Sequence, residues 1–285
     1  MRRIAVINQK GGVAKTTTAV NLAAGLASQG KKVCLMDLDP QAHASLHLGV
    51  QPLPPQPTMY EVLCGETGIA EARVRVNEYL SVVPANLDLA AAELELAGEV
   101  GREVILRDKL PRDPEQLDFL IVDCPPSLGV LTLNALTAVQ EVFLPLQPHF
   151  LALHGLSKLL RTIEVVAKRL NPALRLSGVV LCMYESSTRL AAEVSKDVDD
   201  FFAAHHEHQG VWSGAQFFKT RIRRNIRLAE APSFGKSIFD YAPGSNGAED
   251  YLALTQEILG TIATKPATIP HPMARTGGPT TAAAS

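Results

Sequence analysis

The residues best suited to chemistry lie near the start of the chain, where two lysines flank a pair of glycines. In a glycine-rich turn, backbone N–H groups can point at an anion, and the dipole of a following helix favours negative charge there. A lysine and a threonine that end such a turn contact nucleotide phosphates and Mg²⁺. The stretch therefore predicts a phosphate-binding loop in which Thr16 ligates Mg²⁺ directly. The residues expected to contact the nucleotide are Lys10, Gly11, Gly12, Val13, Ala14, Lys15, Thr16 and Thr17.

The flanking sequence supplies the elements that such a loop needs. An apolar run, Ile4-Ala5-Val6-Ile7, predicts a buried strand over residues 3–8. The Ala- and Leu-rich segment after the loop predicts a helix over residues 15–29, with Gly30 as its C-terminal cap. A strand–helix turn without a ligand would have the same flanks. However, two lysines and three threonines around a glycine pair serve no packing purpose, so we favour phosphate binding.

Two carboxylates follow other predicted strands. Asp39 comes just after the apolar run 32–37, and Asp123 ends the run 117–123. Ligands of a parallel sheet bind outside the carboxyl ends of its strands, where both side chains would lie. Asp123 is then a Walker B carboxylate that reaches Mg²⁺ through water, and Asp39 orients an attacking water. A single aspartate after a strand more often caps the next turn, so the evidence is the combination with the loop.

Strands and helices alternate along most of the chain. This pattern predicts an α/β fold of right-handed βαβ units, with a mostly parallel twisted sheet and helices on both faces. We expect a single domain over residues 1–260 and a disordered, low-complexity tail over residues 261–285. Residues 49–58 are rich in proline and predict an irregular connector. The other predicted strands are 80–84, 141–146, 176–182 and 237–241, and the other predicted helices are 58–63, 87–98, 152–170, 189–204 and 247–259.

Composition limits the possible functions. The 285 residues are 46% hydrophobic and 20% charged, with a net charge of −2, so any nucleic-acid binding must depend on a local patch. The four cysteines, Cys34, Cys64, Cys124 and Cys182, have no C-x-x-C spacing and indicate reduced thiols in a cytosolic protein. No signal peptide or membrane span is evident, and we expect the protein in the cytoplasm.

A basic cluster in the last third of the chain is the candidate for such a patch. Clustered cations bind DNA phosphates without sequence specificity, but most charge runs are solvated loops, so the cluster by itself leaves both open. The cluster consists of Lys219, Arg221, Arg223, Arg224 and Arg227. A second candidate site, His205-His206-Glu207-His208, has no companion cysteines and indicates a solvated helix end rather than a metal site.

Several motifs together resemble one family. The string from Lys10 to Thr16 resembles the deviant Walker A motif of the ParA/MinD group of ATPases. Two strings resemble the switch I and switch II signatures of ParA-family partition ATPases: Asp37-Leu38-Asp39-Pro40-Gln41 and Asp123-Cys124-Pro125-Pro126-Ser127-Leu128. Segments 131–136, 224–233 and 247–252 extend the similarity over about residues 3–259. The chain is thereby identified as a Soj-like member of the ParA family, with the P-loop NTPase fold.

The resemblance implies roles for individual residues. Lys10 would reach the partner's nucleotide across an ATP-dependent homodimer, and Lys15 would hold the chain's own phosphates. Asn225 would contact the adenine. The arginine at the Arg224 position contributes to non-specific DNA binding in the family, and a second family arginine is replaced here by Ser187, with Arg189 as a possible substitute. The implied cofactors are ATP and Mg²⁺, and the implied partners are nucleoid DNA and a ParB-type centromere-binding protein.

Two departures from the family pattern stand out. Most relatives carry glycine where this chain has Ala14, and a methyl group there disfavours a strained backbone conformation. We expect nucleotide binding to survive this change. Relatives also usually have Pro-Arg-Asn where this chain has Arg223-Arg224-Asn225.

The leading hypothesis is therefore a DNA-partitioning ATPase that dimerises with ATP, binds DNA non-specifically and is released when a ParB-type partner stimulates hydrolysis. A MinD-like positioning ATPase is one alternative, although residues 261–285 do not form a basic amphipathic helix. A cluster-bridging reductase or an ATP-dependent ligase is another, but Cys124 lies in a Pro-Pro turn. A DNA-binding scaffold with a weakened ATPase also stays open. The short stretch before the first strand argues against the larger plasmid type, and the cargo, chromosome or plasmid, is left open.

Overall fold

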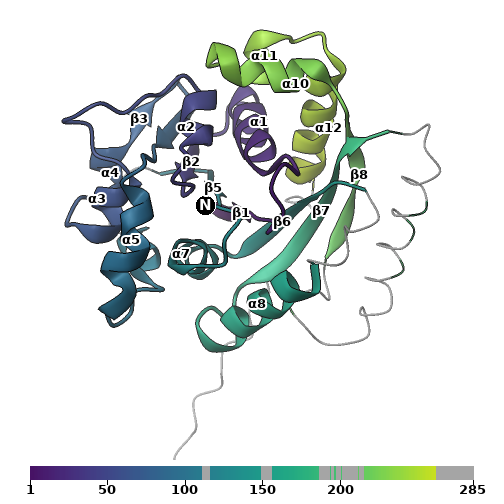
Figure 1. The fold of residues 1–285 in the computed structure, drawn as a ribbon. Coiled ribbons are helices and arrows are strands. Elements are labelled where there is room, and N and C mark those ends of the chain that lie inside the picture. Colours follow the sequence, from purple (N-terminus) through teal and green to yellow (C-terminus); the bar gives the residue numbers. More distant parts are fainter. Residues whose placement is uncertain are drawn as a thin grey trace, which may run out of the picture.

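An eight-stranded sheet runs through the molecule in the order β3-β4-β2-β5-β1-β6-β7-β8 (Figure 1). The computed structural model describes residues 1–110, 116–148, 156–185, 193, 196, 200, 211 and 215–260. All neighbouring strands pair in parallel except β3, which runs antiparallel to β4. The prediction of a mostly parallel α/β sheet is confirmed. The strands are β1 (Arg2–Val6), β2 (Val33–Asp37), β3 (Val74–Arg75), β4 (Leu80–Val83), β5 (Phe119–Asp123), β6 (Glu141–Leu146), β7 (Arg175–Tyr184) and β8 (Gln216–Arg223).

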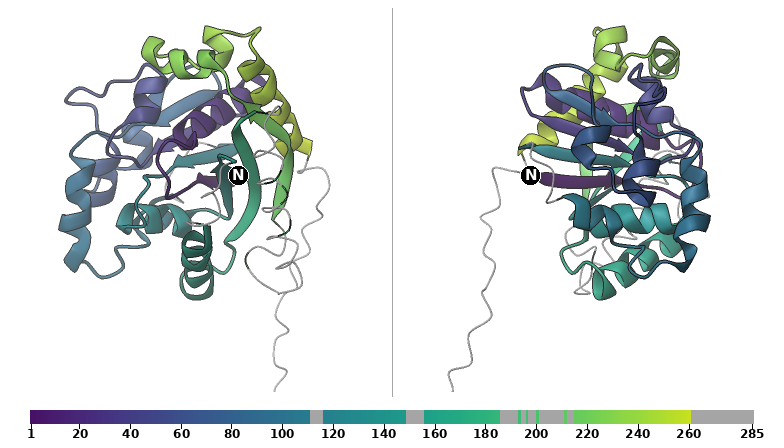
Figure 2. Two further views of the ribbon diagram at one scale, coloured as in Figure 1. Left: turned by 45° about the vertical axis from the view of Figure 1, so that its right-hand side comes forward. Right: turned by 90° about the vertical axis from the view of Figure 1, so that its left-hand side faces the viewer.

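Helices cover both faces of this sheet (Figures 1 and 2). One core lies between the sheet and the layer that contains α1 and α12, and the other lies under α3, α5, α7 and α8. Ile4 and Val6 of β1 face the first core, whereas Ala5 faces the second. A strand buried on both faces needs a continuous apolar run, which is why these strands were visible in the sequence. The helices are α1 (Lys15–Ser28), α2 (His43–His47), α3 (Met59–Cys64), α4 (Ile69–Ala72), α5 (Leu89–Glu95), α6 (Ile105–Lys109), α7 (Val130–Ala138), α8 (Leu156–Arg169), α10 (Ile226–Glu230), α11 (Ile238–Tyr241) and α12 (Asn246–Gly260), with 3-10 turns η1 (Leu96–Gly98) and η3 (Ala231–Phe234).

The strand register brings the phosphate-binding loop and the aspartates at the strand ends to one edge of the sheet. Val6 is paired with Asp123 across β1 and β5, and Asp37 is paired with Asp123 across β2 and β5. The loop after β1 therefore begins beside both carboxylates. This is the arrangement expected when parallel strands end at a common edge.

One predicted strand is wrong. Residues 237–241 form the helix α11, not a strand. The Ser237 side chain caps this helix by accepting the N–H of Asp240, and the N–H of Ile238 donates to the Asn21 side chain at 2.8 Å. A short apolar run does not by itself distinguish a strand from a helix, and here a contact with α1 decides the outcome.

The basic cluster lies largely on a strand that we did not predict. Lys219, Arg221 and Arg223 lie on the edge strand β8, alternating with the buried Phe218 and Ile222. Carboxylates of α12 accept the outward N–H groups of this strand: Glu257 binds those of Lys219 and Thr220, at 2.7 and 3.1 Å, and Asp250 binds that of Arg223 at 2.8 Å. Covering an edge in this way blocks pairing with another strand.

The remaining predicted elements agree with the structure to within a few residues, and the connector over residues 49–58 is irregular as expected. Thr58 caps α3 in a capping box with Glu61. Among the helices that the structure describes, none is long and apolar enough to cross a membrane. Three predictions lie outside the described residues: most of the helix over 189–204, the cluster His205-His206-Glu207-His208 and the tail over 261–285.

Candidate functional site

The phosphate-binding loop joins β1 to α1 and forms one wall of a cleft of about 1130 Å³. Lys15 begins α1 and is only 8% exposed. Its ammonium group donates a hydrogen bond to the carbonyl oxygen of Lys10 at 3.1 Å, so the side chain folds back over the loop. Lys10 itself is exposed and is not among the residues that line the cleft. The two lysines therefore occupy different places, one inside the cleft and one outside it.

Ala14 adopts the left-handed conformation, with φ 68° and ψ 30°. For a residue with a Cβ atom this conformation costs roughly 1–2 kcal/mol, which is the reason that glycine suits the position. Gly12, two residues earlier, has φ 72°. The expected strain at Ala14 is thus present, and part of its cost is offset because the methyl group packs against the core beside α1.

Asp123 ends β5 two residues before Pro125, which lines the cleft. Its side chain is fully buried, and neither carboxylate oxygen makes a hydrogen bond among the described residues. Burial, and then the nearby carboxylate of Asp37, raise the pKa of Asp123 well above its ordinary value, while the nearby Thr16 hydroxyl, and then the Lys15 ammonium, oppose the shift. A buried carboxylate without a partner fits a divalent cation, because Mg²⁺ prefers oxygen ligands and neutralises the charge. The residues present therefore fit Mg²⁺.

Asp37 is a site residue that sequence reasoning did not single out. Its buried carboxylate accepts the backbone N–H and the hydroxyl of Ser45, at 2.8 and 2.7 Å, and the N–H of Asp39 at 3.2 Å. Burial raises the pKa of Asp37 to about 6. The Ser45 hydroxyl oxygen also accepts the N–H of Ala85 at 3.2 Å. Asp37 thus holds the loop that carries Asp39. A signal for it existed in the Asp-x-Asp spacing at the strand end.

The opposite wall of the cleft is built from the end of β8 and from α10. Asn225, the predicted adenine contact, lines this wall. Its side-chain oxygen accepts the N–H of Arg227 at 2.8 Å and caps α10. The rest of this wall is largely apolar and includes Met183, Ile222, Ile226, Leu228, Ala229 and Tyr251. Such a surface suits a flat aromatic group.

Beyond this wall lie the basic side chains, most of which already have intramolecular partners. The Arg221 guanidinium lies 4.6 Å from the centre of the Tyr184 ring and donates to its hydroxyl at 2.6 Å. Arg223 pairs with Asp250 at 2.7 Å and with Glu249 at 3.1 Å. In two further pairs, Arg224 meets Glu185 and Arg227 meets Glu230, each at 2.7 Å. Lys219 is exposed on the same strand, and Arg189 lies outside the described residues.

A buried chain of contacts connects the loop helix to the basic strand. The Thr18 hydroxyl of α1 lies 3.1 Å from the Tyr251 hydroxyl of α12 and 3.6 Å from the Cys182 sulfur of β7. The residue before Tyr251 is Asp250, which binds Arg223.

Burial raises the pKa of Cys182 to about 12, and all four cysteines are free thiols, as predicted.

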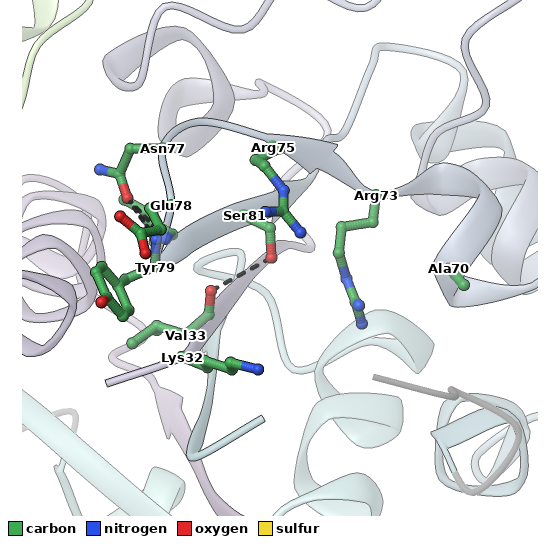
Figure 3. A pocket seen from close by; sticks show the side chains of 10 residues that line it. Lys32, Val33, Ala70, Arg73, Arg75, Asn77, Glu78, Tyr79 and Ser81 are labelled. Atoms are coloured by element: carbon green, nitrogen blue, oxygen red, sulfur yellow. Dashed lines mark hydrogen bonds between the residues drawn. The ribbon is translucent and has the colours of Figure 1, made fainter. Parts of the chain in front are cut away.

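A smaller cavity of about 260 Å³ lies at the other end of the sheet, where β2 and β4 begin. Figure 3 shows Lys32, Arg73 and Arg75 around it, with the Ser81 hydroxyl donating to the carbonyl of Val33 at 3.3 Å. It contains none of the predicted site residues. The large cleft is lined by most of the predicted nucleotide site but not by Lys10, Val13 or Asp123; the predicted residues in its lining are Gly11, Gly12, Ala14, Lys15, Thr16, Thr17, Asp39 and Asn225.

Comparisons with known proteins agree with this geometry. Residues 1–176 match a family model described as an AAA domain. The sporulation initiation inhibitor protein Soj of Bacillus subtilis (strain 168) is 44% identical over 256 residues, which are 90% of this chain and 97% of Soj. The chromosome partitioning protein ParA of Myxococcus xanthus (strain DK1622) is 44% identical over 259 residues, 90% of this chain and 88% of ParA.

Two solved structures extend the comparison. A cobyrinic acid a,c-diamide synthase from Mycobacterium smegmatis, with a bound ATP analogue and magnesium, is 37% identical with a TM-score of 0.77, over 93% of this chain and 96% of that one. The cell division ATPase MinD of Pyrococcus furiosus is 26% identical with a TM-score of 0.71, over 91% of this chain and 99% of MinD.

Proposed function

The chain belongs to the Soj/ParA family of chromosome-partitioning ATPases, and from that premise we propose that it is a DNA-partitioning switch driven by ATP. It is an ATPase, and its cofactors are ATP and Mg²⁺. We propose that it closes into a homodimer with ATP, binds nucleoid DNA non-specifically in the cytoplasm and leaves the DNA on hydrolysis.

In the proposed mechanism, the loop and the N-terminus of α1 hold the phosphates. Lys15 is positioned inside the cleft for this role, and Thr16 and Asp123 would hold Mg²⁺, directly and through water. Bound Mg²⁺ would neutralise charge on the phosphates. Asp39 would orient the attacking water, because the hydrogen bonds of Asp37 fix the start of its loop. Basal hydrolysis is slow if this positioning is completed only when a partner binds.

The position of Lys10 supports the proposed dimer. Its carbonyl oxygen accepts a hydrogen bond from the Lys15 ammonium of the same chain, whereas its side chain is exposed. A side chain placed there suits contact with a nucleotide bound by a second copy. Lys10 of each copy would then complete the other copy's site.

DNA binding would use Lys219, Arg221, Arg223, Arg224 and Arg227, with Arg189 as a further candidate. Exposed ion pairs contribute only about 0–1 kcal/mol each, so phosphates can replace the carboxylates at low cost. Each contact is weak, and a dimer that presents two such surfaces gains affinity because both act together. Arg223 contributes least to this proposal, because two carboxylates already bind it.

One observation carries the proposal: the segment over residues 223–226 lines the cleft and also carries exposed arginines. Its residues line the nucleotide cleft, and the side chains of Arg223 and Arg224 are exposed on the basic surface. A change of nucleotide at this wall would therefore move the basic side chains directly. A ParB-type protein would act on the same cycle by stimulating hydrolysis.

A second candidate, a DNA-binding scaffold with a weakened ATPase, is favoured by the left-handed backbone of Ala14. A strained loop would bind phosphate less tightly, or the protein would hydrolyse ATP more slowly. In either case we propose one ATPase domain over residues 1–260, followed by a separate tail.

The test is retention of DNA by the purified protein with and without ATP, for the wild type, Lys10→Ala, Lys15→Gln and Asp39→Ala. We expect ATP-dependent retention of the wild type, none for Lys15→Gln or Lys10→Ala, and persistent retention of Asp39→Ala as a trapped dimer. Retention of all four without ATP would exclude the switch. Co-sedimentation with anionic vesicles tests the MinD-like alternative, and ATP-dependent binding to vesicles rather than DNA would support it.

A further inference from the structure

The small cavity at the amino ends of β2 and β4 is lined by cations from separate parts of the chain (Figure 3). Lys32 comes from the segment before β2, Arg73 caps the C-terminus of α4, and Arg75 belongs to β3. The volume of about 260 Å³ is just below the usual range for sites that bind drug-sized ligands, and so it suits a smaller ligand. The proposed function does not use this cavity.

The geometry of β3 explains why two of these cations share one side of the sheet. Side chains alternate along an extended chain, and directly paired residues of adjacent strands point to the same face. Val74 and Val76 pack against the core that lies beside α1 and α12. Arg73 and Arg75 alternate with them and therefore point to the opposite face. Arg75 is paired with Ser81 of β4, which also lines the cavity.

The backbone that carries the cations is fixed by hydrogen bonds. The side-chain oxygen of Asn77 accepts the N–H groups of Tyr79 and Leu80, at 3.0 and 2.8 Å, and so closes the turn between β3 and β4. The N–H of Lys32 donates to the carboxylate of Asp118 at 2.9 Å. The cationic side chains thus start from fixed points, which lowers the cost of ordering them around a ligand.

The charges in the lining are not balanced within it. The lining contains three cations and one carboxylate, that of Glu78. Figure 3 shows the Glu78 side chain beside Asn77 and away from the three cationic heads, which point into one space. Arg73 has a further interaction, but among the described residues no carboxylate pairs with the side chain of Lys32 or Arg75. Single surface cations are ordinarily solvated, whereas cations that converge on one cavity favour an anion there.

We propose that this cavity binds a small phosphate-bearing anion, either inorganic phosphate or a phosphate monoester, with Lys32 and Arg75 as its main contacts. The planar guanidinium offers paired N–H donors to two oxygens, and the ammonium adds a compact positive charge. A DNA duplex is a poorer fit, because the carboxylate of Glu78 in the lining would repel neighbouring phosphates. The site goes beyond the proposed function and does not depend on DNA binding.

A bound anion would also connect strands that do not pair directly. Strand β3 has only two residues and lies at the edge of the sheet, where it pairs with β4. An anion held by Arg75 of β3 and by Lys32 would link this edge to β2, the next strand beyond β4. A ligand that binds only the folded chain stabilises it in proportion to the logarithm of its concentration. Occupancy of the cavity should therefore raise the Tm.

The experiment measures binding to the protein saturated with ADP and Mg²⁺, so that the nucleotide cleft is already occupied. Isothermal titration calorimetry at constant ionic strength uses inorganic phosphate, glucose 6-phosphate and a short DNA duplex, which separate the free ion, the monoester and the polymer. The test variant combines Lys32→Gln with Arg75→Gln. The matched control combines Arg161→Gln with Lys168→Gln, which removes two exposed cations from α8. The affinity for ADP checks that each variant is folded.

We expect saturable binding of phosphate or of the monoester to the wild type and to the control, and binding at least about tenfold weaker to the test variant. The Tm of the wild type should rise with the concentration of the bound anion, and that of the test variant should not. Binding of neither small anion to the wild type, or equal binding to the wild type and the test variant, would overturn the proposal. Binding of the duplex alone, lost in the test variant, would also overturn it, because the cavity would then belong to a DNA surface.

Discussion

The nucleotide cleft and the basic surface of β8 differ in the burial and pairing of their charged side chains. Lys15 of the cleft and Asp123, whose carboxylate acts on the Lys15 ammonium, are buried, and the carboxylate oxygens of Asp123 make no hydrogen bond among the described residues. On the β8 side, Arg223, Arg224 and Arg227 are exposed, and each is paired with a carboxylate. A buried charge without a partner is costly, whereas an exposed pair contributes little either way.

This difference indicates how each region works. The cleft retains costly groups that a ligand can satisfy, so its geometry is built before the ligand arrives and single substitutions there should have large effects. The basic surface consists of weak pairs that can exchange partners, so its affinity must come from several contacts together. Substitutions there should have smaller effects, except where an arginine also holds the fold.

The largest expected effect is at Lys15. Lys15→Gln removes the buried cation of the loop, and we expect the affinity for Mg²⁺-ATP to fall by at least about 100-fold, as for a lost charge-assisted contact. Isothermal titration calorimetry measures it. Asp39→Ala is the control, because it should keep the affinity and lose turnover. An unchanged affinity in Lys15→Gln would contradict the assigned cleft.

The next effect concerns His47, a buried group of α2 beside the Asp39 loop. Burial lowers the pKa of His47 to about 4, against an ordinary value of 6.5. The unfolded chain then binds more protons between these two values. Stability is therefore complete above pH 6.5 and falls as the pH drops toward 4, by about 3 kcal/mol at most. Urea unfolding from pH 7 to 4 measures the slope.

The control for this prediction is His47→Gln, which removes the titrating group. Its stability should depend less on pH than that of the wild type over the same range. Equal slopes for the two proteins would show that the histidine is not held neutral in the folded state.

Substitutions of two neighbouring arginines of the basic surface should distinguish an effect on stability from an effect on DNA binding. Arg223→Ala leaves the nearly buried carboxylate of Asp250 without its guanidinium partner, so we expect stability to fall by about 1–2 kcal/mol. Arg224 is paired with the exposed Glu185, and an exposed pair contributes little to stability. We therefore expect Arg224→Glu to change stability by less than about 0.5 kcal/mol while DNA retention is lost.

Urea unfolding and DNA retention are measured on both variants, with ATP affinity as the control for the cleft. If Arg224→Glu retained DNA like the wild type, the basic strand would not be the DNA surface. If Arg223→Ala were as stable as the wild type, its ion pairs would be as weak as those of its neighbours.

The smallest effect is expected at Ala14. Ala14→Gly relieves the left-handed strain, and we expect stability to rise by about 1 kcal/mol or less, since glycine also adds freedom to the unfolded chain. Gly12→Ala is the reverse substitution at a second left-handed position, with φ 72°, and should lower the stability of the protein by a similar amount. Thermal melts measure both. A loss of stability in Ala14→Gly would mean that packing of the methyl group outweighs its backbone strain.

The sequence by itself determined the site at the carboxyl ends of the strands. The loop from Lys10 to Thr16 is contiguous, and the strands before Asp39 and Asp123 are continuous apolar runs, because a parallel sheet is buried on both faces. These signals are local, so they need no knowledge of the fold. Their register, which sets Asp37 and Val6 beside Asp123, then follows from parallel pairing.

Only the tertiary structure decided the rest, because the deciding contacts join residues that are far apart in the chain. The hydrogen bond from Ile238 to Asn21 makes a helix of a segment that we predicted as a strand. Pairing with β7 makes a strand of residues 216–223, which we did not predict, and Asp250 and Glu257 of α12 cover its outer edge. Leu89 and Leu94 of α5 are the same residue type, and packing against the core buries the first and leaves the second exposed.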